Sequence, residues 1–406
     1  MTDPAMIVRV AALGDGVSGD GRHVPLAAPG DIIRANGSIA PGPHHQTPPC
    51  RHFPHCGGCE LQHLDEESYA QFVVDRVEGA LAGQGLEATI RAPTLSPPHS
   101  RRRATLHAER RGSQIVLGYA EAGSHALIDL AECPVLHRDL ADMIKPLRRL
   151  LGVLMTGKRR VDVHLSLVDQ GVDMVLIGVE AAGLVAAEAI SAFGEKYRIA
   201  RLAIDDRDRP EIRWEPEAAS VTLGGAAVPV PPGAFLQATE HGEAALVAAV
   251  REMVGTPATM ADLFAGMGTF ALGVAPRAKV YAAEASRDAI LALKSAAARA
   301  GRLLVTEHRD LYRRPLTVAE LNRFEAIVLD PPRAGAREQA EALAECSADV
   351  IAYVSCNPSS FARDAKVICA GGFQLDWVQP VGQFRWSTHV ELVGRFRRPA
   401  PDTSPS

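Results

Sequence analysis

Apolar runs alternate with segments of helical periodicity from about residue 233 to residue 398. The first five runs are short and bounded by turn residues, as are the strands of a buried parallel sheet. They end near 262–264, at Glu284, near Asp310, at Asp330 and at residue 354. Two further runs, 375–381 and 389–397, close the sheet as a hairpin-like pair. The pattern predicts a doubly wound α/β domain with seven strands.

The chain before residue 233 has a different pattern. Glycines divide residues 1–40 into short β-type runs, and residues 36–49 form a linker rich in proline and glycine. Helical periodicity over 66–83 ends in glycine, and strand-like runs dominate from about 100 to 230, with helices expected over 134–151 and 184–193. We therefore expect four parts: a short β segment (1–40), a central α+β domain (41–232), the doubly wound domain (233–398) and a disordered tail (399–406).

Composition narrows the class of protein. With 406 residues, 47% of them hydrophobic, the chain can bury a large core. No run approaches the ~18 apolar residues of a membrane span, and the first ten residues lack the features of a secretory signal, so we expect a cytoplasmic location and no membrane partner. The net charge of −5 does not advertise a nucleic-acid binder, but clustered arginines, as at 101–103, form local positive patches.

Three of the seven cysteines are close in sequence. Cys50, Cys56 and Cys59 form a C-x₅-C-x₂-C motif whose two glycines allow a tight loop, and Cys133 is the candidate fourth ligand. An odd number of cysteines in a chain of this kind argues against a disulfide framework. Cysteine-only ligation suits zinc or an iron–sulfur cluster, and three clustered cysteines with a remote fourth are more typical of the cluster.

The apolar run at 350–354 breaks abruptly into Ser355, Cys356, Asn357 and Pro358. Proline cannot donate to a sheet ladder, so the strand must stop there. Cys356 therefore lies at the carboxyl end of a central strand, where open α/β sheets bind their ligands. A thiol in this place is either a small buried hydrophobe or a nucleophile.

Other chemistry-bearing residues fall at the same edge of the predicted sheet. A Gly266-x-Gly268 turn after the first strand and Glu284 at the end of the second suit a nucleoside cofactor, whose ribose hydroxyls a carboxylate can bind. Asp330 begins a DPP motif beside this crevice. A glutamate in an apolar strand is costly unless it is paired or functional, and an antiparallel last strand would put Glu391 opposite Cys356.

Five motifs occur in the order of a known family: PPGAFLQAT, DLFAGMGTF, DPPRAG, YVSCNP and THVELV. Together they resemble the RNA uracil-5-methyltransferase family. DLFAGMGTF is similar to the first motif of class I S-adenosylmethionine methyltransferases. CRHFPHCGGC with AECPVL resembles the iron–sulfur branch of the family, which mostly modifies 23S rRNA. Residues 1–40 resemble a shortened TRAM-type, OB-like barrel.

The resemblance implies roles for particular residues. Cys356 is the nucleophile and Glu391 the base. Residues expected to contact S-adenosyl-L-methionine or line its pocket are Gln237, Phe264, Thr269, Glu284, Asp310 and Asp330. Residues expected to hold a 4Fe–4S cluster are Cys50, Cys56, Cys59 and Cys133. The expected partner is RNA, with 23S rRNA favoured over tRNA, and no protein partner is implied.

This chemistry suits the residues. Carbon 5 of uracil is a weak nucleophile, and addition of a thiolate at carbon 6 makes an enolate that concentrates electron density on carbon 5. After methyl transfer, a base removes the carbon 5 proton and the thiolate leaves. The target base must be single-stranded or flipped out to reach the crevice, and the arginine clusters would hold the flanking phosphates.

Two other classes of function compete with this interpretation. An amino methyltransferase of DPPY type would not need Cys356. A non-catalytic iron–sulfur protein that binds RNA would need neither Cys356 nor Glu391, and both are present.

Overall fold

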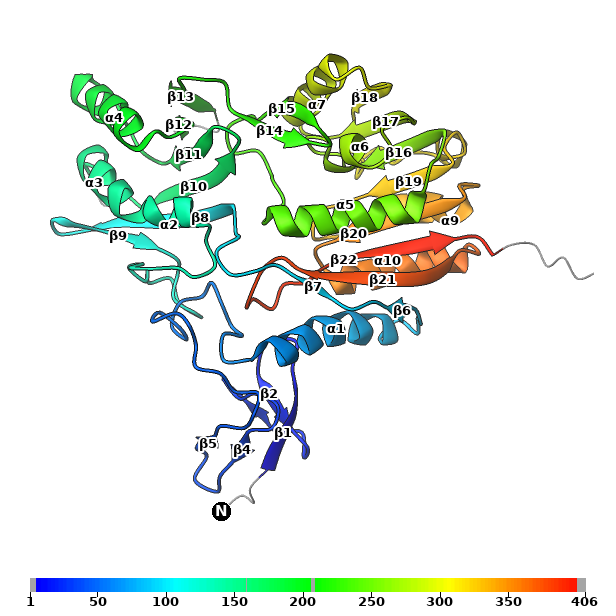
Figure 1. Cartoon of the computed structure of the whole chain (residues 1–406), viewed down its shortest axis with the longest axis horizontal. Coiled ribbons are helices and arrows are strands. Elements are labelled where there is room, and N and C mark those ends of the chain that lie inside the picture. Colours follow the sequence, from blue (N-terminus) through cyan, green and yellow to red (C-terminus); the bar gives the residue numbers. More distant parts are fainter. Residues whose placement is uncertain (1–4, 158, 206–208, 400–406) are drawn as a thin grey trace, which may run out of the picture.

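The computed structural model describes residues 5–157, 159–205 and 209–399. Most of the expected tail, residues 400–406, lies outside them. The largest sheet and the central sheet lie beside each other, and the N-terminal sheet lies apart from both, with helix α1 (Glu66–Ala82) between it and the largest sheet (Figure 1).

The largest sheet is the predicted doubly wound domain, in the order β18-β17-β16-β19-β20-β22-β21-β6, with β7 also paired to β21. The five expected strands β16 to β20 are mutually parallel, and β22 runs antiparallel between β20 and β21. Every residue of β19 and β20 is buried, which explains their uninterrupted apolar sequence. The bounds are β16 Thr259–Leu263, β17 Lys279–Glu284, β18 Leu304–His308, β19 Ala326–Leu329, β20 Val350–Ser355, β21 Gln374–Gly382 and β22 Glu391–Arg397.

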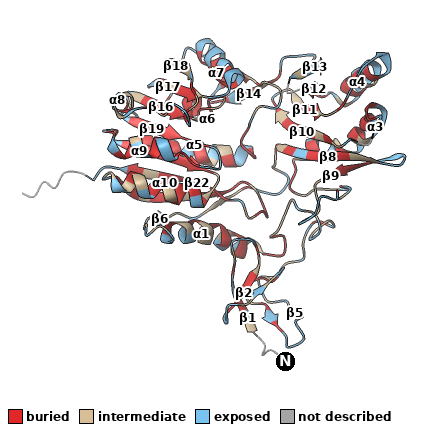
Figure 2. Ribbon diagram, turned by 180° about the vertical axis from the view of Figure 1, so that it is seen from behind, coloured by how far each residue is buried: buried red, intermediate tan, exposed pale blue. Residues whose placement is uncertain are grey.

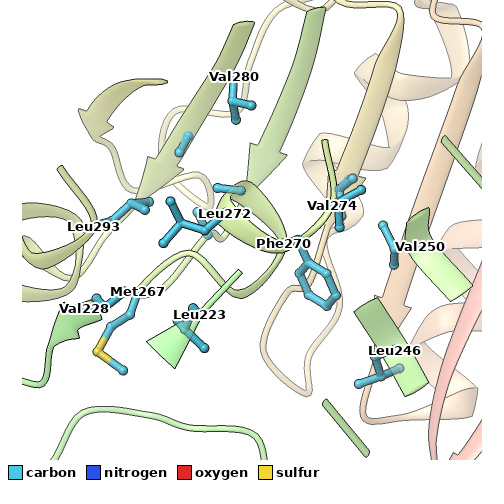
Figure 3. Packing of buried hydrophobic residues seen from close by; sticks show 14 of the residues in the cluster. Leu223, Val228, Leu246, Val250, Met267, Phe270, Leu272, Val274, Val280 and Leu293 are labelled. Atoms are coloured by element: carbon cyan, nitrogen blue, oxygen red, sulfur yellow. The ribbon is translucent and has the colours of Figure 1, made fainter. Parts of the chain in front are cut away.

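Helices cover both faces of this sheet, and each face has its own apolar core. On one face, Leu246 and Val250 of α5 pack near Phe270 of α6 and Val274 (Figure 3). The other face packs against α1, α9 and α10. Buried positions line both sides of the sheet (Figure 2). The bounds are α1 Glu66–Ala82, α5 Glu240–Val254, α6 Thr269–Gly273, α7 Arg287–Arg299, α8 Val318–Leu321, α9 Arg337–Glu345 and α10 Pro358–Ala370.

The central region is a six-stranded sheet in the order β13-β12-β11-β10-β8-β9 with helices on one side. The helix expected over 134–151 is two helices that start later, because Leu136 is in an extended bridge with Arg101. A further hairpin, β14–β15, packs on α7. The bounds are β8 Arg103–Arg111, β9 Gln114–Gly118, α2 Arg138–Asp142, α3 Ile144–Leu154, β10 Val161–Val168, β11 Gly171–Ile177, α4 Leu184–Tyr197, β12 Arg201–Asp205, β13 Pro210–Trp214, β14 Ser220–Leu223 and β15 Ala226–Pro229.

The N-terminal region is a five-stranded antiparallel sheet in the order β3-β2-β1-β4-β5. Its last strand lies within 36–49, so the expectation that this whole segment is linker was wrong. The short strands β6 (Thr89–Ile90) and β7 (Thr94–Leu95) extend the large sheet at β21, which the sequence did not indicate. The remaining bounds are β1 Ala5–Val10, β2 Gly16–Ser18, β3 His23–Val24, β4 Ile32–Ile33 and β5 Ile39–Ala40. The four-part division at 40, 232 and 398 remains a prediction.

Candidate active site

The pairing of β22 with β20 brings the predicted nucleophile and base together. Ser355 is paired with Leu392 in this antiparallel ladder, so the next residues on the two chains are Cys356 and Glu391. Cys356 is half-buried between the end of β20 and the first turn of α10. Asn357 caps that helix and also donates from Nδ2 to the carbonyl oxygen of Arg333 at 3.1 Å. The cysteine loop is thereby tied to the DPP loop.

Charge at this edge is crowded and poorly solvated. Glu391 is 4% exposed, and burial followed by the repulsion of Asp330 raises its pKa to about 8. Asp330 keeps some exposed surface, but desolvation of its carboxyl raises its pKa to about 7. Burial, with Glu391 and Asp330 nearby, raises the pKa of the Cys356 thiol to about 11. The Cys356 thiol is therefore protonated at neutral pH.

Four of the expected cofactor residues lie at the carboxyl ends of β16, β17, β18 and β19, whereas Gln237 lies in the loop before α5 and Thr269 in α6; together they form smaller groups. Glu284 accepts the Gly266 N–H at 2.9 Å and the Ser286 N–H at 2.7 Å. This holds the carboxylate at the glycine turn that opens α6, where Thr269 is the first helical residue.

The second group is aromatic. Phe264 follows β16 with a φ of 60°, a left-handed conformation that is strained for a bulky residue. Its ring centroid is 5.5 Å from that of Tyr312, and the N–H of Tyr312 donates to Asp310 at 3.0 Å. Backbone strain of this kind clusters at ligand sites. Tyr312 was not predicted from the sequence. Its one signal is its position two residues after Asp310.

The third group joins Gln237 to Asp330, two residues that are expected to contact the cofactor. Gln237 donates from Nε2 to Asp330 at 3.2 Å, and its Oε1 accepts from Gln383 at 2.9 Å. Gln383 was not predicted. Its one sequence signal is a glutamine directly after the apolar end of β21.

The four cysteines predicted to bind a metal centre are brought together. Cys50, Cys56, Cys59 and Cys133 line one pocket with an empty volume of about 410 Å³, which includes open solvent. Burial is the main cause that raises the pKa of three of the thiols, and their mutual repulsion adds to it. Within the described ranges, however, no group of three or more His, Cys, Asp or Glu is arranged to hold a metal ion. Cys346 and Cys369 lie apart from this pocket, at the end of α9 and in α10.

Comparison with known proteins agrees with the fold and identifies the family. The family described as tRNA (Uracil-5-)-methyltransferase matches residues 233–396. An uncharacterized RNA methyltransferase of Zymomonas mobilis is 49% identical, over 97% of this chain and 99% of its own. The 23S rRNA (uracil(1939)-C(5))-methyltransferase of Chromohalobacter salexigens is 31% identical, over 89% of this chain and 78% of its own.

A solved structure shares the whole architecture. It is the tRNA (uracil-54, C5)-methyltransferase of Pyrococcus abyssi in complex with S-adenosyl-L-homocysteine, with a TM-score of 0.74. The match is 22% identical and covers 97% of this chain and 100% of that one. At this identity the likeness concerns the fold, which is that of class I S-adenosylmethionine methyltransferases with an N-terminal antiparallel β domain.

These findings confirm the predicted class I methyltransferase fold with an N-terminal β domain, and the chain belongs to the RNA uracil-5-methyltransferase family. It is an RNA (uracil-5-)-methyltransferase that uses S-adenosyl-L-methionine to methylate carbon 5 of uracil in RNA. The iron–sulfur domain and the iron–sulfur branch of the family stay predictions. No helix in the described parts of the chain has the length and apolar character needed to cross a membrane.

The electrostatics of Cys356 lead to a prediction about its reactivity. Only the thiolate is alkylated, so iodoacetamide labelling of Cys356 should accelerate as pH rises toward about 11. Glu391→Gln removes a nearby negative charge, lowers the thiol pKa and should speed labelling at pH 9 by about three- to tenfold. Peptide mass spectrometry measures labelling at Cys356 alone. Glu341→Gln, an exposed change on α9, is the matched control, and equal rates for Glu391→Gln and the parent would contradict the electrostatic account.

Proposed function

We propose that this enzyme methylates a uridine of 23S rRNA through a covalent bond between Cys356 and carbon 6 of the base, with Glu391 as the base that completes the reaction. The observation that carries this proposal is the opposition of Cys356 and Glu391 across the β20–β22 ladder. A nucleophile and a base on neighbouring strands can address carbon 6 and carbon 5 of one pyrimidine, which are bonded to each other. We also expect the enzyme to act in the cytoplasm.

The thiolate of Cys356 adds to carbon 6, and the electron pair of the 5,6 double bond moves toward oxygen 4 as an enolate. S-adenosyl-L-methionine supplies the methyl group, which carbon 5 of the enolate accepts. Glu391 then takes the proton that remains on carbon 5, the double bond re-forms, and the carbon 6–sulfur bond breaks to return the thiolate. A carboxylate with a pKa near 8 is a stronger base than an ordinary glutamate, and its burial supplies that strength.

The thiol must lose its proton before it can add. Its pKa is raised by burial and by two carboxyls, while Arg333 opposes the rise. Protonation of Asp330 or Glu391, whose pKa values are about 7 and 8, would weaken that repulsion. The carboxyl pair thus links the charge of the nucleophile to the charge of the base.

The cofactor pocket that we propose follows the ends of four adjacent strands. Glu284 is placed to bind ribose hydroxyls, because its carboxylate lies at the glycine turn. The ring of Phe264 packs near that of Tyr312, Asp310 accepts the Tyr312 N–H, and these residues would hold the adenine. Thr269 begins α6, and Asp330 with Gln237 would contact the methionine part beside Cys356.

Positive groups near the mouth of the site suit RNA phosphates. Besides burial, Arg333 lowers the pKa of Arg76, and Arg333, Arg101 and Arg76 all lower the pKa of His389. Mutual repulsion of this kind is relieved when phosphate groups bind between the cations. Arg333 also acts on Cys356, so phosphates held there would flank the target nucleotide.

Substitutions of the two proposed catalytic residues should have opposite effects on the amount of covalent protein–RNA adduct. Cys356→Ala should abolish both methyl transfer and the covalent protein–RNA complex, because no bond to carbon 6 can form. Glu391→Gln should slow turnover by about 10²–10⁴-fold while the methylated complex accumulates, because the carbon 5 proton stays in place. Denaturing gels with labelled RNA and a tritiated methyl donor measure both quantities.

Cys369→Ala, a thiol in α10 outside the site, serves as the control and should retain turnover. Full methylation by Cys356→Ala would instead support an amino methyltransferase. Absence of transfer by the parent enzyme on any RNA would support a non-catalytic RNA-binding protein.

The choice of 23S rRNA rests on the relative from Chromohalobacter salexigens, which is a 23S rRNA (uracil(1939)-C(5))-methyltransferase. The competing substrate is tRNA, which the enzyme from Pyrococcus abyssi modifies. Mapping of 5-methyluridine in both RNAs from a deletion strain and its complemented parent separates them. We expect one 23S rRNA uridine to lose its methyl group, and loss from tRNA alone would refute this target.

We also propose that the four-cysteine pocket holds a 4Fe–4S cluster. All four thiols line this pocket, the carboxylate in its lining, Glu132, is bonded to Arg51, and Gly58 leaves room beside the Cys56 sulfur, which is 3.6 Å from where its Cβ would lie. A bound cluster would tie the loop of residues 50–59 to Cys133 and has no redox part in the proposed reaction.

The loop that would hold the cluster is hydrogen-bonded, through the residues that follow it, to the segment before Glu391. The N–H groups of Glu60 and Leu61 both donate to the carbonyl oxygen of Trp386 at 2.9 Å, and Glu60 accepts the Thr388 N–H at 3.2 Å. The loop of residues 50–59 therefore supports the segment that leads to Glu391.

Cys133→Ser should remove iron, sulfide and visible absorbance, and should weaken RNA binding, because the loop loses its anchor. Iron analysis and RNA binding by filter retention test this, with Cys346→Ser as the control outside the pocket. Undiminished RNA affinity and activity in iron-free protein would overturn the structural role that we assign to the cluster.

A further inference from the structure

Two buried glutamines connect the carboxyls of Asp330 and Glu391, and the proposed reaction does not account for one of them. Gln237 donates to Asp330 Oδ2 at 3.2 Å and accepts from Gln383 Nε2 at 2.9 Å. Gln383 follows β21 two residues after Val381, which is paired with Glu391 in the β21–β22 ladder, and its side chain lowers the pKa of the Glu391 carboxyl. The exposed fraction is 4% for Gln237 and 1% for Gln383, so neither amide can exchange these partners for water.

A backbone group determines which way this chain of hydrogen bonds runs. The Ala238 N–H donates to Gln383 Oε1 at 3.1 Å. Because a backbone N–H can only donate, Oε1 must face Ala238 and Nε2 must face the other way. One proton on Nε2 then goes to Gln237 Oε1, and the second remains available for the neighbouring Glu391 carboxylate. Since Gln237 Oε1 is occupied as an acceptor, its own Nε2 is left to donate to Asp330.

The surroundings hold the two amides in this arrangement. Arg102 donates from its backbone N–H to the Ala238 carbonyl at 2.9 Å and from Nε to the Gln237 carbonyl at 3.1 Å. On the other side, a Cβ at Gly242 of α5 would lie 2.7 Å from Gln383 Cβ and 2.9 Å from its Oε1. Glycine at this position is therefore what allows Gln383 to reach Ala238.

We infer that Gln383 is a positioning residue: it donates a hydrogen bond that orients the Glu391 carboxylate and favours the charged form that can accept the proton from carbon 5. This inference rests on the proposed function and adds a residue to it. Gln237 has a second role here beyond its expected place beside the cofactor, because it fixes the orientation of Gln383.

Loss of the Gln383 donor should change the pKa of Glu391 in one definite direction. Three other charged or titratable groups face Glu391: Asp330 after β19, Arg103 of β8 and Cys356 after β20. Burial and Asp330 raise the pKa of Glu391, whereas Gln383 and Arg103 oppose the rise. Removal of the Gln383 donor therefore raises this pKa further. Because Glu391 acts as a base in its deprotonated form, proton removal then slows at neutral pH and recovers at higher pH.

Gln383→Met tests this in the full-length enzyme, because methionine keeps the length of the side chain and removes the N–H. The experiment follows the decay of the methylated covalent complex with substrate RNA in a single turnover across pH. We expect the midpoint of the decay rate to move up by about one pH unit, with about tenfold slower decay at neutral pH. Adduct formation on RNA containing 5-fluorouridine, which cannot lose its fluorine to a base, should stay unchanged.

A second variant perturbs the same contact without touching either amide. Gly242→Ala should displace Gln383 and shift the midpoint in the same direction. Gly79→Ala, a matched change in the interior of α1 where an added Cβ meets nothing within 4 Å, should leave it unchanged.

An unshifted midpoint in both Gln383→Met and Gly242→Ala would overturn the inference, as would a rise in the KM for S-adenosyl-L-methionine with no change in the pH profile. These outcomes differ from a failure of the proposed function, which would appear as the absence of any adduct on Cys356 in the parent enzyme.

Discussion

The antiparallel insertion of β22 between β20 and β21 is the constraint on which the active site depends. A parallel strand in this place would start at the opposite edge of the sheet and carry Glu391 away from the crevice. Because β22 runs the other way, its first residue lies where β20 ends, and the ladder pairs Ser355 with Leu392 beside Cys356 and Glu391. The β21–β22 hairpin and the apolar cores on both faces hold this register.

Burial at this edge does chemical as well as structural work. A glutamate, an aspartate and a thiol share a poorly solvated space, and each has a raised pKa for that reason. The arrangement costs stability, because charges are desolvated and repel one another. The amides of Gln237 and Gln383 offset part of this cost by donating to the carboxyls. The proposed base, Glu391, and the proposed nucleophile, Cys356, thus lie at adjoining positions of neighbouring strands.

The sequence predicted most of this site because its strands end in polar residues. Apolar runs that stop at Glu284, Asp330 and Cys356 could be assigned to one edge of a parallel sheet from periodicity and topology alone. What it did not predict depends on contacts between distant segments. The strands β6 and β7 have two residues each, too few for a pattern, and they exist because β21 offers an edge. Gln383 acquires its role only from Ala238 and Gly242, which lie more than a hundred positions away.

The central claim is that a single pyrimidine bonds to Cys356 while Glu391 faces its carbon 5. An experimental structure of the enzyme bound to S-adenosyl-L-methionine and RNA with 5-fluorouridine at the target position would test it most directly. The account predicts a bond from Cys356 Sγ to carbon 6, the transferred methyl group on carbon 5, and the Glu391 carboxylate against carbon 5. An unbonded base in the pocket, or a different carboxylate at carbon 5, would contradict it.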